Sequence, residues 1–189
     1  MTEENQGLVF IPRDELFFKI AIISDPQVEK TRFLNQFVSR RFDERYLPTI
    51  GLNISKEQVI LNDEMGNNLV INLQIWDIAP QPQFYMLHRP YFNGSDGAIL
   101  MYDVSELSNL DIVPEKIQEI RKFCGDIPIF MLGIIQPYRT IPIEKIAKIN
   151  EKYKLSGFYE TTPESRRIVE NIFKQMVKII YERYVNSTR

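Results

Sequence analysis

The segment SDPQVEKT, residues 24–31, carries the side chains of this chain that are best suited to bind a phosphate group. It ends in Lys30 and Thr31, and a lysine and a hydroxyl at the end of a strand-to-helix loop can contact phosphate oxygens and magnesium. Such loops also hold phosphate with successive backbone N–H groups, which glycines leave accessible. This segment contains no glycine, and Pro26 has no N–H to donate. The side chains therefore suit phosphate, whereas the backbone does not.

Alternating apolar runs and amphipathic stretches predict the elements that position this loop. The expected strands are 17–23, 51–61, 69–76, 97–104, 127–134 and 157–161, and the expected helices are 30–41, 114–124, 142–153 and 163–184. The connection between the second and third strands is too short for a parallel crossover, so these two strands form an antiparallel hairpin. The pattern predicts an α/β fold: six strands, all parallel except the outer strand of the hairpin, with helices on both faces.

Length and composition indicate one globular domain in a reducing compartment. The chain has 189 residues, a formal net charge of −2 and a single cysteine, which gives no electrostatic case for nucleic acid and excludes an internal disulfide. We expect a flexible leader over 1–16, the folded domain over 17–184 and a short tail over 185–189. No signal peptide, membrane-spanning run or lipidation motif is evident, so we expect a cytoplasmic protein without a lipid anchor.

Ligands of such sheets bind at the carboxyl ends of the strands. That rule selects four loops as the candidate site, namely 24–31, 77–84, 134–138 and 161–165. Elsewhere, we expect Cys124 to be a buried structural thiol, the lone His88 to lie on the surface without a metal, and Asp103 to order the loop that follows its strand.

Several blocks together resemble the Ras/Rab-type small GTPases. They are FKIAIISDPQVEKTRFL, YLPTIG, WDIAPQPQF, YFNGSDGAILMYDVS and IPIFMLGI, and they occur in the order and spacing of that family across residues 17–184. The resemblance implies the P-loop small-GTPase fold, which agrees with the fold predicted from the residues, and a nucleotide with magnesium at the carboxyl edge of the sheet.

The resemblance also implies roles for individual positions. Lys30 stands where the family's lysine reaches the β- and γ-phosphates, and Val28 and Glu29 are loop positions beside the phosphates. Gln81 stands where a glutamine orients the attacking water. The positions that would hold magnesium are Thr31, Thr49 and Asp77.

Other positions depart from the family pattern. Glu29 replaces the glycine beside the lysine, and an alternative role for Glu29 is to pair with Lys30 or Arg32. Pro80 replaces a glycine whose N–H contacts the γ-phosphate. Ile134-Ile135-Gln136-Pro137 and Thr162-Pro163-Glu164 replace the base-recognition segments N-K-x-D and S-A-K. Losing two hydrogen bonds to the phosphates and two to the base, at about 1.5–3 kcal/mol each, would remove roughly 6–12 kcal/mol of binding free energy. That is about four to eight decades of affinity.

Two hypotheses follow, and the departures favour the first. The first is a GTPase-like protein with impaired GTP binding and hydrolysis, which acts as an interaction module for an unidentified protein partner. Its contact surface would comprise Tyr46, Pro48, Phe84 and Tyr85, whereas Ile50 and Tyr91 are expected in the core. The second is a slow nucleoside triphosphatase with altered base recognition, in which Gln81 would be catalytic. The expected cofactor is none, or magnesium with a weakly bound nucleoside triphosphate.

Overall fold

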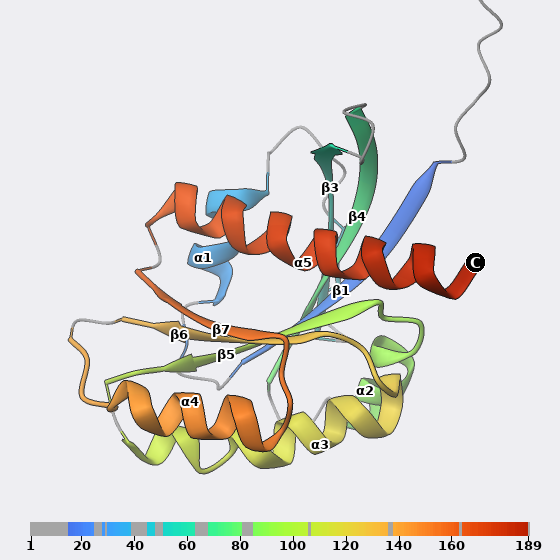
Figure 1. Cartoon of the computed structure of the whole chain (residues 1–189). Helices are drawn as coiled ribbons and strands as arrows, with labels where there is room; N and C mark the ends of the chain where they lie inside the picture. Colours follow the sequence, from blue (N-terminus) through green and yellow to red (C-terminus); the bar gives the residue numbers. More distant parts are fainter. Residues whose placement is uncertain are drawn as a thin grey trace, which may run out of the picture.

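The computed structural model describes residues 15–24, 28, 30–38, 45–47, 51–62, 68–80, 85–105, 107–135, 138–162 and 164–188. Its elements form three layers, with one sheet between two groups of helices (Figure 1). Helices α1 (Lys30–Phe37) and α5 (Arg166–Thr188) cover one face of the sheet, and α3 (Val113–Cys124) and α4 (Ile143–Lys152) cover the other (Figure 1). This is the α/β architecture that the alternating pattern predicted.

The sheet contains the six expected strands and one more short strand. Its order is β2-β3-β4-β1-β5-β6-β7. The bounds are Leu16–Ser24 for β1, Arg45–Leu47 for β2, Leu52–Asn62 for β3, Asn68–Ile78 for β4, Gly97–Asp103 for β5, Ile129–Ile134 for β6 and Gly157–Thr161 for β7. Strand β3 is antiparallel to both of its neighbours, and the other pairings are parallel. One strand therefore runs against the rest, as predicted. Three residues are too few to give β2 a recognisable alternation.

The helices match the expected ones, except that α1 ends at Phe37 rather than at 41, α2 was not expected, and α5 both begins and ends later than 163–184. They are α1 Lys30–Phe37, α2 Tyr85–Phe92, α3 Val113–Cys124, α4 Ile143–Lys152 and α5 Arg166–Thr188, with a short 3-10 helix, η3, over Leu107–Leu110. Helix α2 was not expected, because Pro90 lies inside it and proline usually ends a helix. Helix α5 continues past the expected end at 184, because no glycine or proline follows to stop it, so most of the expected 185–189 tail is helical. At the other end, Leu16 already belongs to β1 rather than to the leader.

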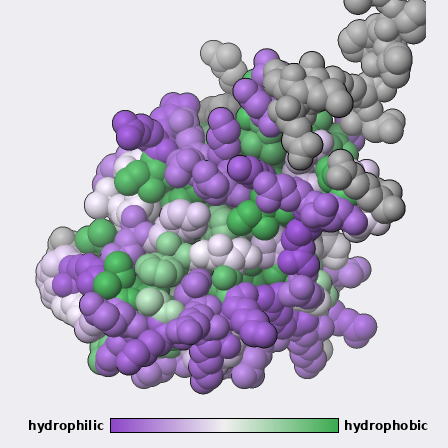
Figure 2. All heavy atoms as spheres, in the orientation of Figure 1, coloured by the Kyte–Doolittle hydropathy of each residue, from purple (hydrophilic) through white to green (hydrophobic). Residues whose placement is uncertain are grey.

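The core has one part on each face of the sheet. In β1, Ile20 and Ile22 face α5, whereas Ala21 and Ile23 face α3. One apolar stripe of α5 is buried, and it comprises Val169, Ile172, Phe173, Met176 and Ile180. Because this stripe faces inward, the visible outer face over α5 and α4 is mostly hydrophilic, with small separated hydrophobic areas (Figure 2).

Three aromatic rings hold α1 against α5. The ring of Phe173 stacks on that of Phe37, with centroids 4.0 Å apart, and lies 6.3 Å from that of Phe33. Phe33 and Phe173 are completely buried. Since α1 begins at Lys30, this packing fixes where the lysine side chain starts.

Gly133, in β6, has no room for a side chain. A Cβ added there would lie 2.6 Å from Val104 Cγ1 and 3.2 Å from Tyr102 Cζ. We expect Gly133→Ala to lower the free energy of unfolding by about 1–3 kcal/mol, through overpacking. Urea unfolding measures this as a lower midpoint with an unchanged m value.

Gly157 on the neighbouring strand is the matched control for that substitution. A Cβ there would meet Tyr159 Cε2 at 3.4 Å, an ordinary contact. Gly157→Ala should therefore leave the midpoint nearly unchanged. Equal effects of the two substitutions would contradict the packing argument for Gly133.

Candidate functional site

The carboxyl edge of the sheet brings Lys30 and Asp77 together. Lys30 Nζ lies 2.6 Å from Asp77 Oδ1, and it also donates a hydrogen bond to the carbonyl of Ile78. Among the described residues, no hydrogen bond of regular geometry reaches Asp77 Oδ1, so the contact with Lys30 is an ion pair. Both are nearly buried, with 8% of the Lys30 side chain and 12% of the Asp77 side chain exposed.

Strand register explains why these two residues meet. Asp77 lies opposite Ile22 in the parallel pairing of β4 with β1, close to the carboxyl end of both strands. The chain leaves β1 at Ser24 and enters α1 at Lys30. The first side chain of α1 is therefore placed above the end of β4.

Burial sets the electrostatics of this pair. Burial lowers the pKa of the Lys30 ammonium, and the Asp77 carboxylate acts in the opposite direction. A buried charge needs a partner of opposite sign together with hydrogen bonds, and Lys30 obtains both from β4. The Lys30 ammonium, which was predicted to bind phosphate, thus contacts a carboxylate oxygen of Asp77 and the carbonyl oxygen of Ile78.

The structure describes only part of the predicted phosphate and magnesium set. Val28 packs in the core on the α5 face, and its carbonyl accepts a 2.7 Å hydrogen bond from the Lys30 N–H. Pro80 is half-buried just after β4. Glu29, Thr49 and Gln81 lie outside the described residues, as does the side chain of Thr31 in the first turn of α1.

Two ion pairs are described at this edge, and the pairing suggested for Glu29 lies outside the described residues. Lys30 pairs with Asp77, and Arg32 pairs with Glu164, in the segment that replaces S-A-K. The second pair is exposed and contributes little stability. The sequence places both residues of the first pair at the carboxyl edge, because Lys30 opens the first helix and Asp77 ends a strand. It does not show that the two side chains pair.

In the segment that replaces N-K-x-D, the two described residues have no polar side chain to offer a base. Ile134 is completely buried at the end of β6, and the Ile135 N–H donates to the Thr161 carbonyl at 2.9 Å. Gln136 and Pro137 lie outside the described residues.

An ion pair that the sequence did not reveal lies beside this segment. Arg139 donates to Glu160 at both carboxylate oxygens, at 2.8 and 3.1 Å, which ties the loop after β6 to β7. The described residues here are an aliphatic side chain and a carboxylate already held by arginine. They do not fit a guanine base, and no step of nucleotide chemistry follows from them.

The other residues singled out in the sequence have structural roles. Asp103 orders the following loop as predicted, because its Oδ1 accepts a 2.7 Å hydrogen bond from the Ser105 N–H and its carbonyl accepts one from Asn109. Among the described residues, no group of His, Cys, Asp and Glu could hold a metal ion. His88 lies in α2, and its side chain is outside the description. No helix in the described part is long and apolar enough to cross a membrane.

The predicted contact surface is only partly described. Pro48 and Phe84 lie outside the described residues, while Tyr46 in β2 and Tyr85 at the start of α2 are described in backbone only. Tyr91 is buried, as predicted. No role was predicted for Trp76, whose ring lies 6.4 Å from that of Tyr91 and beneath Lys19, with Nζ 3.6 Å from the ring centroid.

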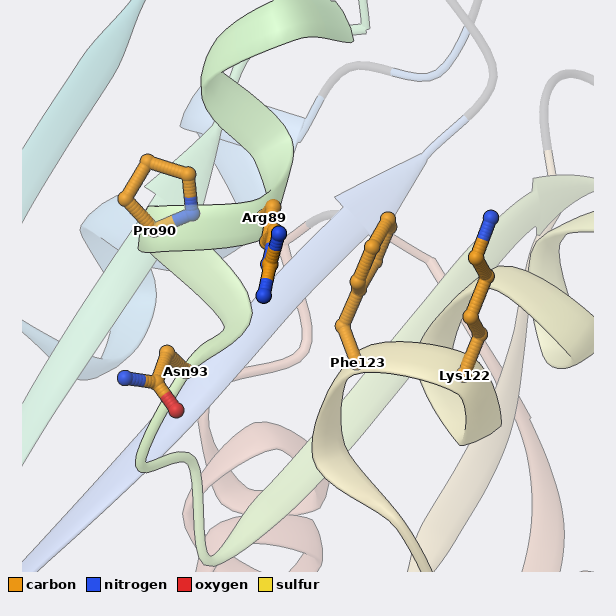
Figure 3. Close-up of a pocket in the computed structure, with 5 residues that line it drawn as sticks. All are labelled: Arg89, Pro90, Asn93, Lys122 and Phe123. Carbon is orange, nitrogen blue, oxygen red and sulfur yellow. The ribbon is translucent and has the colours of Figure 1, made fainter.

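A pocket between two helices lies away from this edge. A pocket of about 400 Å³ between α2 and α3 is lined by Arg89, Pro90, Asn93, Lys122 and Phe123 (Figure 3). These residues come just before β5 and β6 in the chain, so they lie near the amino ends of the strands, whereas the candidate site lies at the carboxyl ends. The pocket is therefore not part of the candidate nucleotide site.

Cys124, at the end of α3, is partly buried and unreactive by environment. Its Sγ donates to the Phe92 carbonyl at 3.3 Å, and burial raises the pKa of the thiol to about 11. At pH 8 only about one thousandth of the thiol would be ionised, so we expect iodoacetamide to react about 100-fold more slowly than with an ordinary thiol. Mass spectrometry should show the rate rising about tenfold per pH unit from pH 8 to 10. The denatured protein is the control, and a rate that levels off below pH 9 would contradict the assignment.

Comparison with known proteins agrees with this architecture. A model of the Ras family matches residues 19–182. The chain is 30% identical over 171 residues to the Ras-related protein Rab-11C of Dictyostelium discoideum, which covers 88% of this chain and 74% of that protein. It is 29% identical over 173 residues to the Ras-related protein Rab7 of Drosophila melanogaster, with 88% and 81% covered, and 27% identical over 173 residues to the human Ras-related protein Rab-19, with 89% and 77% covered. With the family match running from β1 to α5 over the sheet described above, the chain belongs to the Ras family.

Proposed function

We propose that this Ras-family chain is impaired in GTP binding and hydrolysis, and that it acts in the cytoplasm as an interaction module. The observation that carries the proposal is the buried ion pair between Lys30 and Asp77. The resemblance assigns one of these side chains to phosphate and the other to magnesium. In this chain they neutralise each other.

A nucleotide would have to separate that pair before it could use either side chain. Separating a buried pair without replacing the lost partner costs about 3–5 kcal/mol, so the ligand must offset this first. Two described positions offer a nucleotide nothing in exchange, since Pro80 has no N–H and Ile134 is a buried aliphatic residue. These departures together favour weak or absent nucleotide binding.

A slow nucleoside triphosphatase is the second candidate, and one observation favours it. Ser24 Oγ is buried at the end of β1, where the loop to Lys30 begins, and it has no hydrogen-bond partner in the described part of the chain. An unpaired buried hydroxyl costs about 1–3 kcal/mol, which a bound phosphate oxygen would remove. The two candidates therefore differ on whether purified protein carries nucleotide.

The first test is to denature freshly purified protein and separate any released nucleotide by ion-exchange chromatography. The proposal predicts no stoichiometric nucleotide. It also predicts that 1 mM Mg-GTP or Mg-ATP raises the melting temperature by no more than about 1 °C, because a ligand with a dissociation constant above 1 mM stabilises by less than about 0.4 kcal/mol. Stoichiometric GDP or GTP would overturn the proposal, and another nucleotide would establish the second candidate.

The proposed contact surface comprises Tyr46, Pro48, Phe84 and Tyr85, and its occupant is a protein partner. A search with the wild-type chain should be run beside Tyr46→Ala and Tyr85→Ala, because aromatic side chains often dominate such contacts. Tyr138→Ala is the matched control, since Tyr138 is an exposed tyrosine in the loop after β6. Partners captured equally by all four proteins would contradict this surface.

A further inference from the structure

In the described part of the chain, no strand pairs with the first residues of β1 on the edge that faces β5, and this is called the open edge. It pairs with β4 from Leu16 onward, whereas its pairing with β5 begins only at Ile20. Lys19 closes the edge at that point, because its N–H donates to Asp96 Oδ2 at 2.7 Å and its carbonyl accepts from the Asp96 N–H at 2.8 Å. Backbone groups of alternate residues point to the same edge of a strand. The N–H and carbonyl of Phe17 therefore face the open edge.

A groove of about 340 Å³ runs along the same edge. Its apolar lining consists of Phe18 from β1, Ile127 and Pro128 before β6, and Ile180 and Tyr184 from α5. The rings of Phe18 and Tyr184 meet edge to face at 6.3 Å. Phe17 and Tyr184 are 56% and 45% exposed, which is high for aromatic side chains.

A strand edge beside an apolar groove accepts an added strand, through backbone hydrogen bonds and alternate side chains. We propose that Leu8–Ile11 of the same chain is that strand. The run LVFI lies within residues 1–14, which are outside the described residues, and the chain enters β1 directly at this edge.

The sequence between the run and β1 suits a reversal of the chain. The residues from 12 to 15 are Pro, Arg, Asp and Glu. Proline and aspartate favour a tight turn, and four-residue loops commonly join antiparallel strands. The run would thus return along β1, with Phe10 beside Phe17 and Val9 beside Phe18.

This register places each side chain of the run. The Phe10 backbone bonds to the open N–H and carbonyl of Phe17, and the two rings form a cross-strand pair. Side chains alternate along a strand, so Val9 and Ile11 lie on the same face as Phe18 and enter the groove. A short loop holds the run at millimolar effective concentration, which favours it over a second copy or a separate peptide.

Hydrogen exchange of the full chain, followed by mass spectrometry, tests the pairing. We expect amides of 8–11 to exchange at least about tenfold more slowly than in an unstructured peptide, because exchange then requires local opening. Val9→Asp places a carboxylate in the groove and should return the exchange to within about twofold of the unstructured rate. Asn5→Asp introduces the same group outside the run and should keep the protection.

A second pair of variants tests the groove. Dilution tests whether the run in the groove comes from the same chain or from a second copy. Tyr184→Ser should remove the protection of 8–11, whereas Tyr138→Ser, which alters an exposed tyrosine in the loop after β6, should keep it. Exchange at the unstructured rate in the unaltered chain would overturn the proposal. Protection that disappears on about twentyfold dilution would also overturn it, since the run would then come from a second copy.

Discussion

Replacing Lys30 with methionine is expected to lower the free energy of unfolding by about 3–5 kcal/mol. The substitution keeps most of the length of the side chain but leaves the carboxylate of Asp77, which is only 12% exposed, without its cation. An unpaired buried charge is among the few defects large enough to produce such an effect. Urea unfolding of both proteins measures the difference as a shift of the midpoint.

A double-mutant cycle separates the loss of the pair from the loss of the lysine. Asp77→Leu alone should also destabilise, whereas Lys30→Met combined with Asp77→Leu should recover most of the loss, because replacing both charges with apolar groups is often neutral or stabilising by about 1–4 kcal/mol. The coupling between the two sites is read from the four unfolding free energies.

Arg32 supplies the matched control on the same helix. Its ion pair with Glu164 has both side chains more than half exposed, so Arg32→Met should change the unfolding free energy by no more than about 1 kcal/mol. A Lys30→Met effect as small as the Arg32→Met effect would show that the Lys30–Asp77 contact does not matter in solution. The interaction-module proposal would then lose its main support.

The sequence predicted the elements of the sheet well because their patterns are long. Buried parallel strands such as 97–104 and 127–134 appear as unbroken apolar runs, and the hairpin follows from a connection too short for a crossover. Besides the short 3-10 helix η3, the missed elements were β2, at Arg45–Leu47, and α2, at Tyr85–Phe92. The first is too short to show a period, and the second contains a proline that argues for a break.

The candidate site could be located from the sequence, but its internal pairing could not. The rule that ligands bind at the carboxyl ends of parallel strands selected the loops that contain Lys30 and Asp77. Which partner Lys30 takes depends on strand order, because Asp77 comes close only when β4 lies next to β1. Arg139 and Glu160 show the same limit, since loop conformation rather than sequence spacing joins them.

Replacing Phe173 with alanine is expected to lower the free energy of unfolding by about 3–5 kcal/mol, the range for removing a fully buried aromatic ring. Its ring stacks on Phe37 and lies against Phe33, so the cavity would open between α5 and α1. Urea unfolding measures the loss. Ile143→Ala on α4 is the control, because Ile143 is exposed and its truncation should cost about 0.5 kcal/mol or less.

The same substitution tests whether helix packing positions the site. If the aromatic contacts between α1 and α5 fix where Lys30 starts, loosening them weakens the contact of Lys30 with Asp77 as well. Lys30→Met should then cost at least about 0.5 kcal/mol less in the Phe173→Ala protein than in the unaltered chain. Effects that add to within about 0.3 kcal/mol would contradict this link. In that case Lys30 and Asp77 would meet through the short loop after β1 alone, and the hydrophobic core would contribute only to global stability.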